Sequence, residues 1–486
     1  MCSKLQNPDF LRLFCEKNSD GTLNLRLKGR ELYQRIGCRI NEDNVLAVID
    51  FLKSEPRIVS LDLCYNDLGD DGARLLADHY FNSENNLKSL NLMHCDITHN
   101  GLKYLSDSKH LYLLVCRLNG NKLGVEGARF IANLIDNCQN LEVLDIAETD
   151  QTLESIESIV ILMETEKLKV IDISRVIPSS FLTKYNDVTL ADDLSVMLRI
   201  NTYLKELHIQ KCEFDGHDVE LLVEGLMCNK TLEMLNLGCN RMGDMGAELL
   251  GCWLKTRPPL RGLNVSANNI KNIGARALSY GMPYSKLRFL DISNNKIGSA
   301  GLENILDTLK KYCQMRILAI WGNTGIGQSS VCKRIERLLR AGVLNQEYFD
   351  VKLYEVDGML HAAYYPAEHF KHNYYSVLDY GYPPELKIVR NKVPDPIALP
   401  RELLNFTHIA RYPPVDDKLF LRVRKEKMCQ DESEEEIGKV VFEIEEESST
   451  DDTTHVKLDE ELTDFTTYCS YCTGPCSQPK HEQVNK

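Results

Sequence analysis

Ten segments of this chain repeat the pattern Leu-x-x-Leu-x-Leu-x-x-Asn-x-Leu. They begin at Ile58, Leu87, Leu113, Leu141, Leu168, Leu204, Leu232, Leu260, Leu287 and Met315. Successive starts are 26 to 29 residues apart, except for one step of 36 residues from Leu168 to Leu204. A unit this short cannot bury its apolar face alone, so neighbouring units must stack. The repeat therefore predicts one long solenoid.

Each unit predicts a strand followed by a helix. In Leu235-Asn236-Leu237 apolar and polar residues alternate, which indicates a strand with one buried face. Further on, Ala247, Leu249 and Leu250 have the spacing of a helix that packs on that strand. Because a helix is wider than a strand, we expect parallel strands on the concave side and helices outside. The predicted fold class is therefore an α/β solenoid.

The ninth position of the pattern predicts a buried hydrogen-bonding ladder. Asparagine occupies it in six units, at Asn66, Asn121, Asn240, Asn268, Asn295 and Asn323. A buried amide can pair with backbone groups of adjacent units and so remain satisfied. Cys95 and Cys212 fill the same position in two other units, whereas Thr149 and Val176 depart from it.

Residues 40–345, with these motifs, resemble the ribonuclease-inhibitor class of leucine-rich repeats. This class also occurs in GTPase-activating proteins for Ran, in NOD-like receptors and in tropomodulins. The resemblance implies a horseshoe of about ten repeats with an open concave surface. It implies a function in binding, because the motifs specify the fold and no particular chemistry.

The chain divides by pattern into five regions. We expect an N-terminal cap, the repeat solenoid with an insertion near 175–190, a tyrosine-rich cap, a proline-rich extended segment and an acidic, disordered tail. Their boundaries are 1–57, 58–345, 346–382, 383–426 and 427–486. In the first region Leu23, Leu25 and Leu27 alternate as in a strand, and residues 42–52 have helical spacing. The insertion is either a tolerated loop or a loop that contacts a partner.

Charge and apolar content argue against nucleic-acid and membrane partners. The net charge is −14, but residues 427–465 alone hold 15 acidic residues and 3 lysines, so the solenoid is nearly neutral. The sequence has no run of 18 apolar residues and no apolar signal peptide at Met1. We therefore expect an intracellular protein, and the family resemblance implies a setting in the cytoplasm and nucleus, including the nucleolus.

Cysteine usage agrees with a reducing compartment. The chain has 17 cysteines, an odd number, and several lie at repeat positions, namely Cys95, Cys116, Cys212 and Cys239. We interpret these as reduced thiols packed as small apolar residues.

Motifs that suggest chemistry are weak. Residues 322–329 resemble a phosphate-binding loop, but Gln328 stands where the lysine is required, so we predict no nucleotide cofactor. Four residues near the C-terminus are either unstructured or a zinc site, namely Cys469, Cys472, Cys476 and His481.

No catalytic triad can be assigned, so we predict that the protein is not an enzyme. The enzymatic alternative is a GTPase-activating protein of the Ran type.

The strand face is the predicted site for a protein partner. Positions 3, 5, 7 and 8 of each pattern should face the concavity, where position 5 forms a polar strip. The predicted contact residues are Trp321, Phe289, Tyr65, Arg117, Arg175 and His208. Trp321 could instead pack under the tyrosine-rich cap.

The predicted function is a non-catalytic intracellular interaction scaffold. The alternative within the binding class is a structural subunit of a large assembly such as the axoneme. The sequence leaves the oligomeric state open.

Overall fold

The structure, a computed structural model, describes residues 4–18, 20–164, 168–177, 190–309, 315 and 317–365. The chain divides into two units at residue 412, and every described residue belongs to the first. The predicted insertion falls largely on residues 178–189, which lie outside the described residues. The predicted proline-rich segment, the acidic tail and the four candidate zinc ligands also lie outside them.

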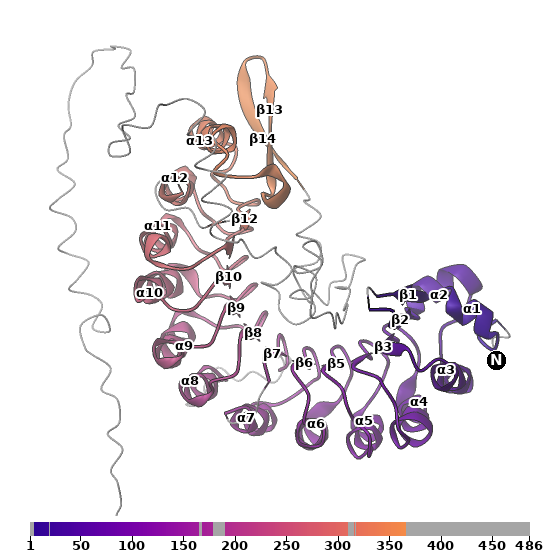
Figure 1. The fold of residues 1–486 in the computed structure, drawn as a ribbon. Coiled ribbons are helices and arrows are strands. Elements are labelled where there is room, and N and C mark those ends of the chain that lie inside the picture. The colour runs from indigo at the N-terminus through magenta and orange to yellow at the C-terminus, as the bar shows by residue number, and fades with distance from the viewer. Residues whose placement is uncertain are drawn as a thin grey trace, which may run out of the picture. The chain divides into compact units, whose positions relative to one another are not determined.

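One sheet of twelve strands runs through the described part of the solenoid in chain order (Figure 1). Its strands are β1 (Cys15–Lys17), β2 (Leu23–Arg26), β3 (Ile58–Asp62), β4 (Ser89–Asn91), β5 (Val115–Arg117), β6 (Val143–Asp145), β7 (Val170–Asp172), β8 (Glu206–His208), β9 (Met234–Asn236), β10 (Gly262–Asn264), β11 (Phe289–Asp291) and β12 (Ile317–Ala319). β1 pairs antiparallel with β2, and all later pairs are parallel. Equivalent repeat positions pair across strands, as Leu235, Leu263 and Leu290 do.

Helices cover the outer side of this sheet (Figure 1). They are α1 (Pro8–Arg12), α2 (Gly29–Ile36), α3 (Glu42–Ser54), α4 (Gly69–Leu76), α5 (His99–Ser106), α6 (Gly124–Asn137), α7 (Leu153–Leu162), α8 (Leu190–Ile200), α9 (Gly216–Cys228), α10 (Gly243–Lys255), α11 (Asn272–Gly281), α12 (Ser299–Thr308) and α13 (Ser329–Arg340), with short turns η1 (Ala77–Phe81), η2 (Met282–Tyr284) and η3 (Gln346–Tyr348). The predicted α/β solenoid, with parallel strands inside and helices outside, is confirmed.

The predicted asparagine ladder is also confirmed. The Asn121 amide nitrogen donates to the carbonyls of Leu92 and Leu118, both at 2.7 Å. Its oxygen accepts the backbone N–H groups of Cys95 and Ile97 at 3.0 and 3.1 Å. Each such amide therefore joins two neighbouring repeats, and its burial leaves no polar atom without a partner.

A left-handed residue follows every strand of the ten repeats. Position 8 has φ between 47° and 82° in all of them, at Tyr65, His94, Gly120, Glu148, Arg175, Lys211, Cys239, Ala267, Asn294 and Gly322. This conformation turns the chain so that position 9 points back into the core. Non-glycine residues adopt it at a cost, which the ladder bonds of position 9 offset.

Side chains of one repeat also satisfy the helix start of the next. The Asp70 carboxylate accepts the backbone N–H groups of Thr98 and Gly101 at 2.7 and 3.0 Å, at the start of α5. Asp244 does the same for α11, and Asn272 for α12. The first N–H groups of a helix have no partner within the helix, so these bonds stabilise both the helix and the repeat boundary.

Both ends of the described repeats carry extra strands. The leucines at 23 and 25 form β2, which extends the sheet, and the predicted helix at 42–52 corresponds to α3. After α13 the chain forms a hairpin of β13 (Val351–Val356) and β14 (Met359–Tyr364). Asp357 and Gly358 both have positive φ at its turn, a backbone that Asp-Gly adopts readily in tight hairpin turns.

The cysteine prediction holds for some positions and is wrong for one. Cys95 and Cys116 are buried and Cys212 is half-buried, but Cys239 is exposed. Cys239 is at position 8, where the left-handed backbone directs the side chain away from the core.

Candidate protein-interaction surface

The inner face comprises the side chains at positions 3 and 5 of the ten repeat strands. Position 3 is occupied by Ser60, Ser89, Val115, Val143, Val170, Glu206, Met234, Gly262, Phe289 and Ile317, and position 5 by Asp62, Asn91, Arg117, Asp145, Asp172, His208, Asn236, Asn264, Asp291 and Ala319. All of these residues except Asp62 are buried. The strip that the sequence indicates as an open polar surface is therefore inaccessible in the structure.

Most polar side chains at position 5 have a local structural role. In seven repeats the carboxylate or amide oxygen accepts the backbone N–H of position 7, as Asp172 does from Ser174 at 2.9 Å and Asn264 from Ser266 at 2.9 Å. The others are Asp62, Asn91, Asp145, Asn236 and Asp291. This Asx turn ends the strand in these seven repeats. Aspartate and asparagine therefore recur at position 5 because their side-chain oxygens accept a backbone N–H, a role that needs no binding partner.

Arg117 and Asp145 form a buried ion pair in the middle of the inner face. Arg117 Nε lies 3.3 Å from Asp145 Oδ2, and each side chain is 1% exposed. Burial raises the pKa of the Asp145 carboxyl, the neighbouring charge of Asp172 raises it further, and Arg117 lowers it. Burial likewise raises the pKa of Asp172. The ion pair therefore offsets only part of the cost of removing these carboxylates from water.

His208 is held from both ring nitrogens. The Asn236 oxygen already accepts the Gly238 N–H, so its amide nitrogen, 3.1 Å from His208 Nδ1, is the donor. His208 Nε2 then carries the proton and donates to Glu206 Oε2 at 3.3 Å. The imidazole is thus bonded to an amide and a carboxylate, with no serine or cysteine nucleophile in either bond, so the geometry supports a structural network.

Apolar residues at position 3 form two clusters along the inner face. Val115, Val143 and Val170 form one, with Leu114 packed beside it. Met234, Phe289 and Ile317 form the other, against which Tyr348 packs. The predicted contact residue Phe289 is 2% exposed and belongs to this second cluster.

Accessible side chains occur at position 8 of the repeats, which together with Trp321 at position 7 we call the rim, whereas most other position-7 side chains are buried. At its N-terminal end the rings of Tyr65 and His94 stack with centroids 5.0 Å apart, and the Arg30 guanidinium lies 4.0 Å from the Tyr65 centroid. A Cβ added at Gly120 would clash with the His94 ring. The glycine at position 8 of the third repeat therefore allows this stack to form.

In the middle of the rim, Arg175 pairs with Glu148. Arg175 Nη1 lies 3.3 Å from Glu148 Oε1, and the arginine side chain is 53% exposed. An ion pair this exposed contributes little to stability. The Arg175 charge therefore remains accessible to a partner, whereas the Glu148 side chain is only 16% exposed.

At the C-terminal end of the rim, Trp321 is half-buried. Its ring lies 5.8 Å from that of Tyr364 on β14. The Asp350 carboxylate accepts the backbone N–H groups of Ile320 and Trp321 at 3.0 and 2.8 Å. Asp350 thus satisfies the donors that a further repeat would otherwise engage. No signal in the sequence points to Asp350, because it lies beyond the last repeat.

The stability of this C-terminal contact should depend on pH. Burial raises the pKa of Asp350 to about 7, whereas its two backbone donors lower it. An acid whose pKa rises on folding binds its proton more tightly when folded, so stability falls as pH rises from about 4 to about 7. Relative to Asp350→Asn, wild type should lose up to about 1.4 kcal/mol per pH unit in that window. Urea unfolding followed by Trp321 fluorescence in a Trp253→Phe background measures this, and parallel pH profiles would contradict it.

The six predicted contact residues therefore divide into two groups. Tyr65, Arg175 and Trp321 are at least partly accessible on the rim, whereas Phe289, Arg117 and His208 are buried on the inner face. Side chains buried on the inner face contact one another, as Arg117 and Asp145 do. Partner contact at any of the six stays a prediction.

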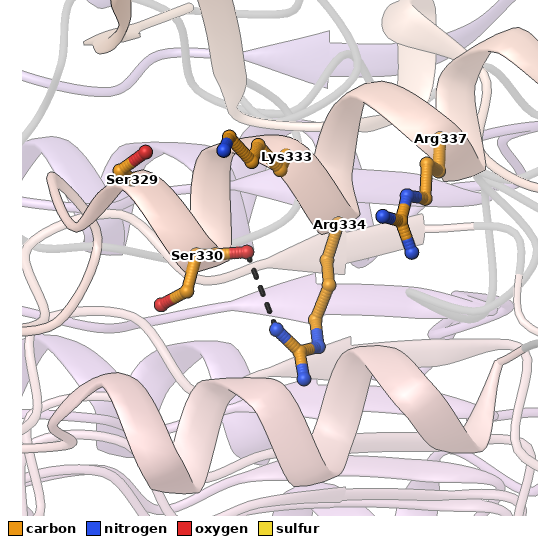
Figure 2. A pocket seen from close by; sticks show the side chains of 5 residues that line it. All are labelled: Ser329, Ser330, Lys333, Arg334 and Arg337. Atoms are coloured by element: carbon orange, nitrogen blue, oxygen red, sulfur yellow. Dashed lines mark hydrogen bonds between the residues drawn. The ribbon is translucent and has the colours of Figure 1, made fainter. Parts of the chain in front are cut away.

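A basic hollow on the outer side comes from α13. Figure 2 shows Ser329, Ser330, Lys333, Arg334 and Arg337 lining a cavity of about 480 Å³. Arg334 points to α12, where it pairs with Asp307 and Glu303 at 3.2 and 3.3 Å. Lys333 and Arg337 are exposed, as cations on a solvated helix face usually are. This surface therefore carries charge but offers no buried polar group to a ligand.

The described residues also offer little for catalysis or metal binding. Burial raises the pKa of the Cys138 thiol to about 11 and of Cys212 to about 12, so neither is a ready nucleophile. Within the described ranges, no three histidine, cysteine or acidic side chains are grouped to hold a metal ion. No helix among them has the length and apolar content needed to cross a membrane.

Comparison with known proteins agrees with the observed repeat geometry. A family model for the leucine-rich repeat matches residues 58–77, 84–106, 228–251 and 285–306. Pig ribonuclease inhibitor (Sus scrofa) is 27% identical over 312 residues, covering 63% of this chain and 66% of the inhibitor. The mouse inhibitor (Mus musculus) is 27% identical over 320 residues, covering 64% and 67%. The chain is a leucine-rich repeat protein by fold, and its sequence is similar to ribonuclease inhibitors.

The similarity of this leucine-rich repeat protein to its relatives is confined to part of their length. It spans about two thirds of the two ribonuclease inhibitors. The bovine NACHT, LRR and PYD domains-containing protein 3 (Bos taurus) is 26% identical over 235 residues, which cover 45% of this chain and 22% of that protein. Any activity of the whole relatives therefore transfers only as a proposal.

Proposed function

We propose that this protein is a non-catalytic interaction scaffold that binds one protein partner through the strand side of its solenoid. The observation that carries the proposal is the unbroken sheet of in-register parallel strands, which presents a rigid surface along the repeats. Relatives named ribonuclease inhibitors support the use of such a solenoid in protein recognition. Rigid strands lose little conformational entropy on binding, which favours this use.

The rim is the accessible part of that surface. Trp321 and the Tyr65–His94 stack supply aromatic area at its two ends, and the Arg175–Glu148 pair supplies charge between them. Aromatic residues and arginine dominate binding energy at protein interfaces. We propose that one partner bridges these groups. We propose further that binding takes place in the cytoplasm and nucleus, including the nucleolus.

The test compares partners of strand-side and helix-side variants by proximity labelling. Tyr65→Ala, Arg175→Glu and Trp321→Ala change the rim. Tyr104→Ala and Tyr280→Ala are the matched controls, because these tyrosines are 43% and 49% exposed on helices. We expect at least a tenfold loss of the same partner with the rim variants, as removal of an interface anchor costs about 2 kcal/mol or more. An unchanged partner list, or equal loss with the controls, would refute the proposal.

A second assay addresses the absence of catalysis. The full chain at substoichiometric levels should leave GTP hydrolysis by small GTPases, Ran included, at the intrinsic rate. An acceleration under these conditions would show that the protein is an enzyme activator and would replace the scaffold proposal.

A further inference from the structure

The edge at which the repeat strands begin carries a continuous row of side chains. The row consists of position 2 of each repeat, directly before the strand, and we call it the entry row. The Lys169 carbonyl accepts the backbone N–H groups of Lys205 and Glu206, at 2.8 and 2.9 Å. The same pair of bonds to the next repeat recurs at every position 2 from Lys88 to Arg261. The backbone therefore fixes these side chains in a row, with neighbours about 4.8 Å apart.

Basic residues predominate in the described part of the entry row. Two of the nine described position-2 residues are acids, namely Glu142 and Glu233. Five are cations, namely Lys88, Lys169, Lys205, Arg261 and Arg288. The row is therefore net positive, although the whole chain has a net charge of −14.

The paired cations of this row are more exposed than its acids. Lys169 Nζ lies 2.6 Å from Glu142 Oε1, and Glu233 pairs with both Lys205 at 3.0 Å and Arg261 at 3.5 Å. The three cationic side chains are 42%, 46% and 43% exposed, whereas the two glutamates are 27% and 25% exposed. A long cationic side chain covers the surface beneath it and keeps its charged end in water. The entry row therefore presents mainly positive charge to the solvent.

Two exposed tyrosines lie beside the entry row. Tyr112 and Tyr203 each precede the first residue of a repeat, and they are 39% and 45% exposed. The Lys88 ammonium lies 5.4 Å from the centroid of the Tyr112 ring. Tyrosine provides rigid contact area at protein interfaces. This edge of the solenoid thus combines positive charge with aromatic area.

We propose that the entry row is a second interaction surface, which binds an extended acidic segment of a partner protein. The negative charges of such a segment complement the exposed cations of the row. Seven strand-to-strand steps separate Lys88, before β4, from Arg288, before β11, which is about 34 Å. An extended segment of about ten residues spans this distance.

A protein segment fits this row better than a nucleic acid does. Glu142 and Glu233 interrupt the row, and a peptide places uncharged residues opposite them, whereas a nucleic acid carries a phosphate at every nucleotide. The Tyr112 ring is also engaged, because Lys88 lies over it and its hydroxyl is 3.1 Å from His110 Nδ1. It is therefore less suited to stacking with a base.

This surface goes beyond the proposed function, because it lies at the opposite ends of the strands from the rim. The entry row precedes each strand, whereas the rim follows it. The two surfaces share no residue. A partner at the rim and an acidic segment at the entry row therefore bind independently, and variants of one surface leave the other intact.

Fluorescence anisotropy with a labelled poly-L-glutamate peptide tests the surface in the full chain. We expect binding that weakens as salt is raised from about 50 mM to about 300 mM. Lys205→Gln with Arg261→Gln should weaken it about tenfold, since each exposed charge contributes about threefold. Lys103→Gln with Lys255→Gln is the matched control, because it removes two exposed cations from helices and should leave the affinity unchanged. A lack of binding, or an equal loss with the control, would overturn the proposal.

The opposite change separates binding from folding. Glu142→Gln with Glu233→Gln removes both acids of the described row and should tighten poly-L-glutamate binding about tenfold. A damaged fold cannot produce this gain. Unchanged or weaker binding by this variant would overturn the proposal even if the Lys205 and Arg261 variant failed to fold.

A nucleic acid is distinguished by the same assay. Labelled poly-uridine should bind the full chain more weakly than poly-L-glutamate does. Tighter binding of poly-uridine, lost in the variant of Lys205 and Arg261, would overturn the proposal in favour of a nucleic-acid surface.

Carbodiimide cross-linking distinguishes the acidic tail of the chain itself. The reagent joins a lysine amine and a carboxylate as an amide and takes up the water released. Links from Lys169 to Glu142 and from Lys205 to Glu233 serve as the internal reference. In the presence of the peptide we expect Lys205 to link to poly-L-glutamate as well. Links from Lys205 to residues 427–465 of the same molecule instead would overturn the proposal in favour of an intramolecular contact.

Discussion

Replacing Asn121 by alanine is expected to lower the free energy of unfolding by about 4 kcal/mol. The amide of Asn121 is 1% exposed and makes four hydrogen bonds to backbone groups of its own and the preceding repeat. Alanine would leave two carbonyls and two N–H groups buried without these partners. A buried unsatisfied group costs about 1–3 kcal/mol, and partial entry of water offsets some of the total.

Urea unfolding measures the effect, and hydrogen exchange locates it. Because stability in a repeat protein is nearly a sum of unit and boundary terms, exchange should increase most in the repeats around β4 and β5. Asn100→Ala is the matched control, since this exposed asparagine on α5 makes only a weak side-chain contact with Thr98. A loss below about 1 kcal/mol for Asn121→Ala would mean that the ladder is not a main source of stability.

Replacing Arg117 by alanine is expected to destabilise the protein by about 3 kcal/mol at pH 8 and by less at pH 5. Loss of the guanidinium leaves the Asp145 carboxylate buried beside Asp172 without its cation. The pKa of Asp145 in the folded state then rises further, because the group that lowered it is gone. A raised folded pKa makes stability fall as pH rises, so protonation at pH 5 relieves part of the penalty.

The double variant Arg117→Met with Asp145→Asn separates charge from packing. It removes both charges and keeps side chains of similar length, so it should recover most of the stability lost by Arg117→Ala. Urea unfolding at pH 5 and pH 8 provides the comparison. If Arg117→Ala lost the same free energy at both pH values, the ion pair would not be the origin of its effect.

The fold could be predicted from the sequence because one pattern recurs ten times. The period determines the alternation of strand and helix, and a buried asparagine at position 9, present in six of the ten repeats, must find backbone partners in its neighbours. Asp357-Gly358 likewise predicts the hairpin turn by its preference for positive φ. In these cases a local residue preference and the repeat geometry indicate the same structure.

The state of the inner face could not be predicted in the same way. Aspartate at position 5 suggests a surface for partners, although its oxygen accepts the backbone N–H two residues later, as in Asp172 and Ser174. The recurrence of aspartate or asparagine at one fixed position is the available signal for an Asx turn. Burial of His208 and Phe289 depends on what covers the strands, which the repeat pattern does not encode. The hydrogen bonds of Asp350 could not be predicted either, because the tertiary structure determines which backbone N–H groups lie near its carboxylate.

The side-chain contacts between repeats have a fixed direction along the chain, so each repeat depends on which repeats precede and follow it. Asp70 serves the helix start of the repeat after it, while Asn121 reaches back to the repeat before it. A splice form lacking residues 87–112 would preserve the leucine period yet bring Asp70 up to α6, whose first residues follow Leu123 and lack a side-chain cap of their own. Neighbouring units are thus matched pairs, and shuffling or skipping them should be tolerated less well than their similar sequences suggest.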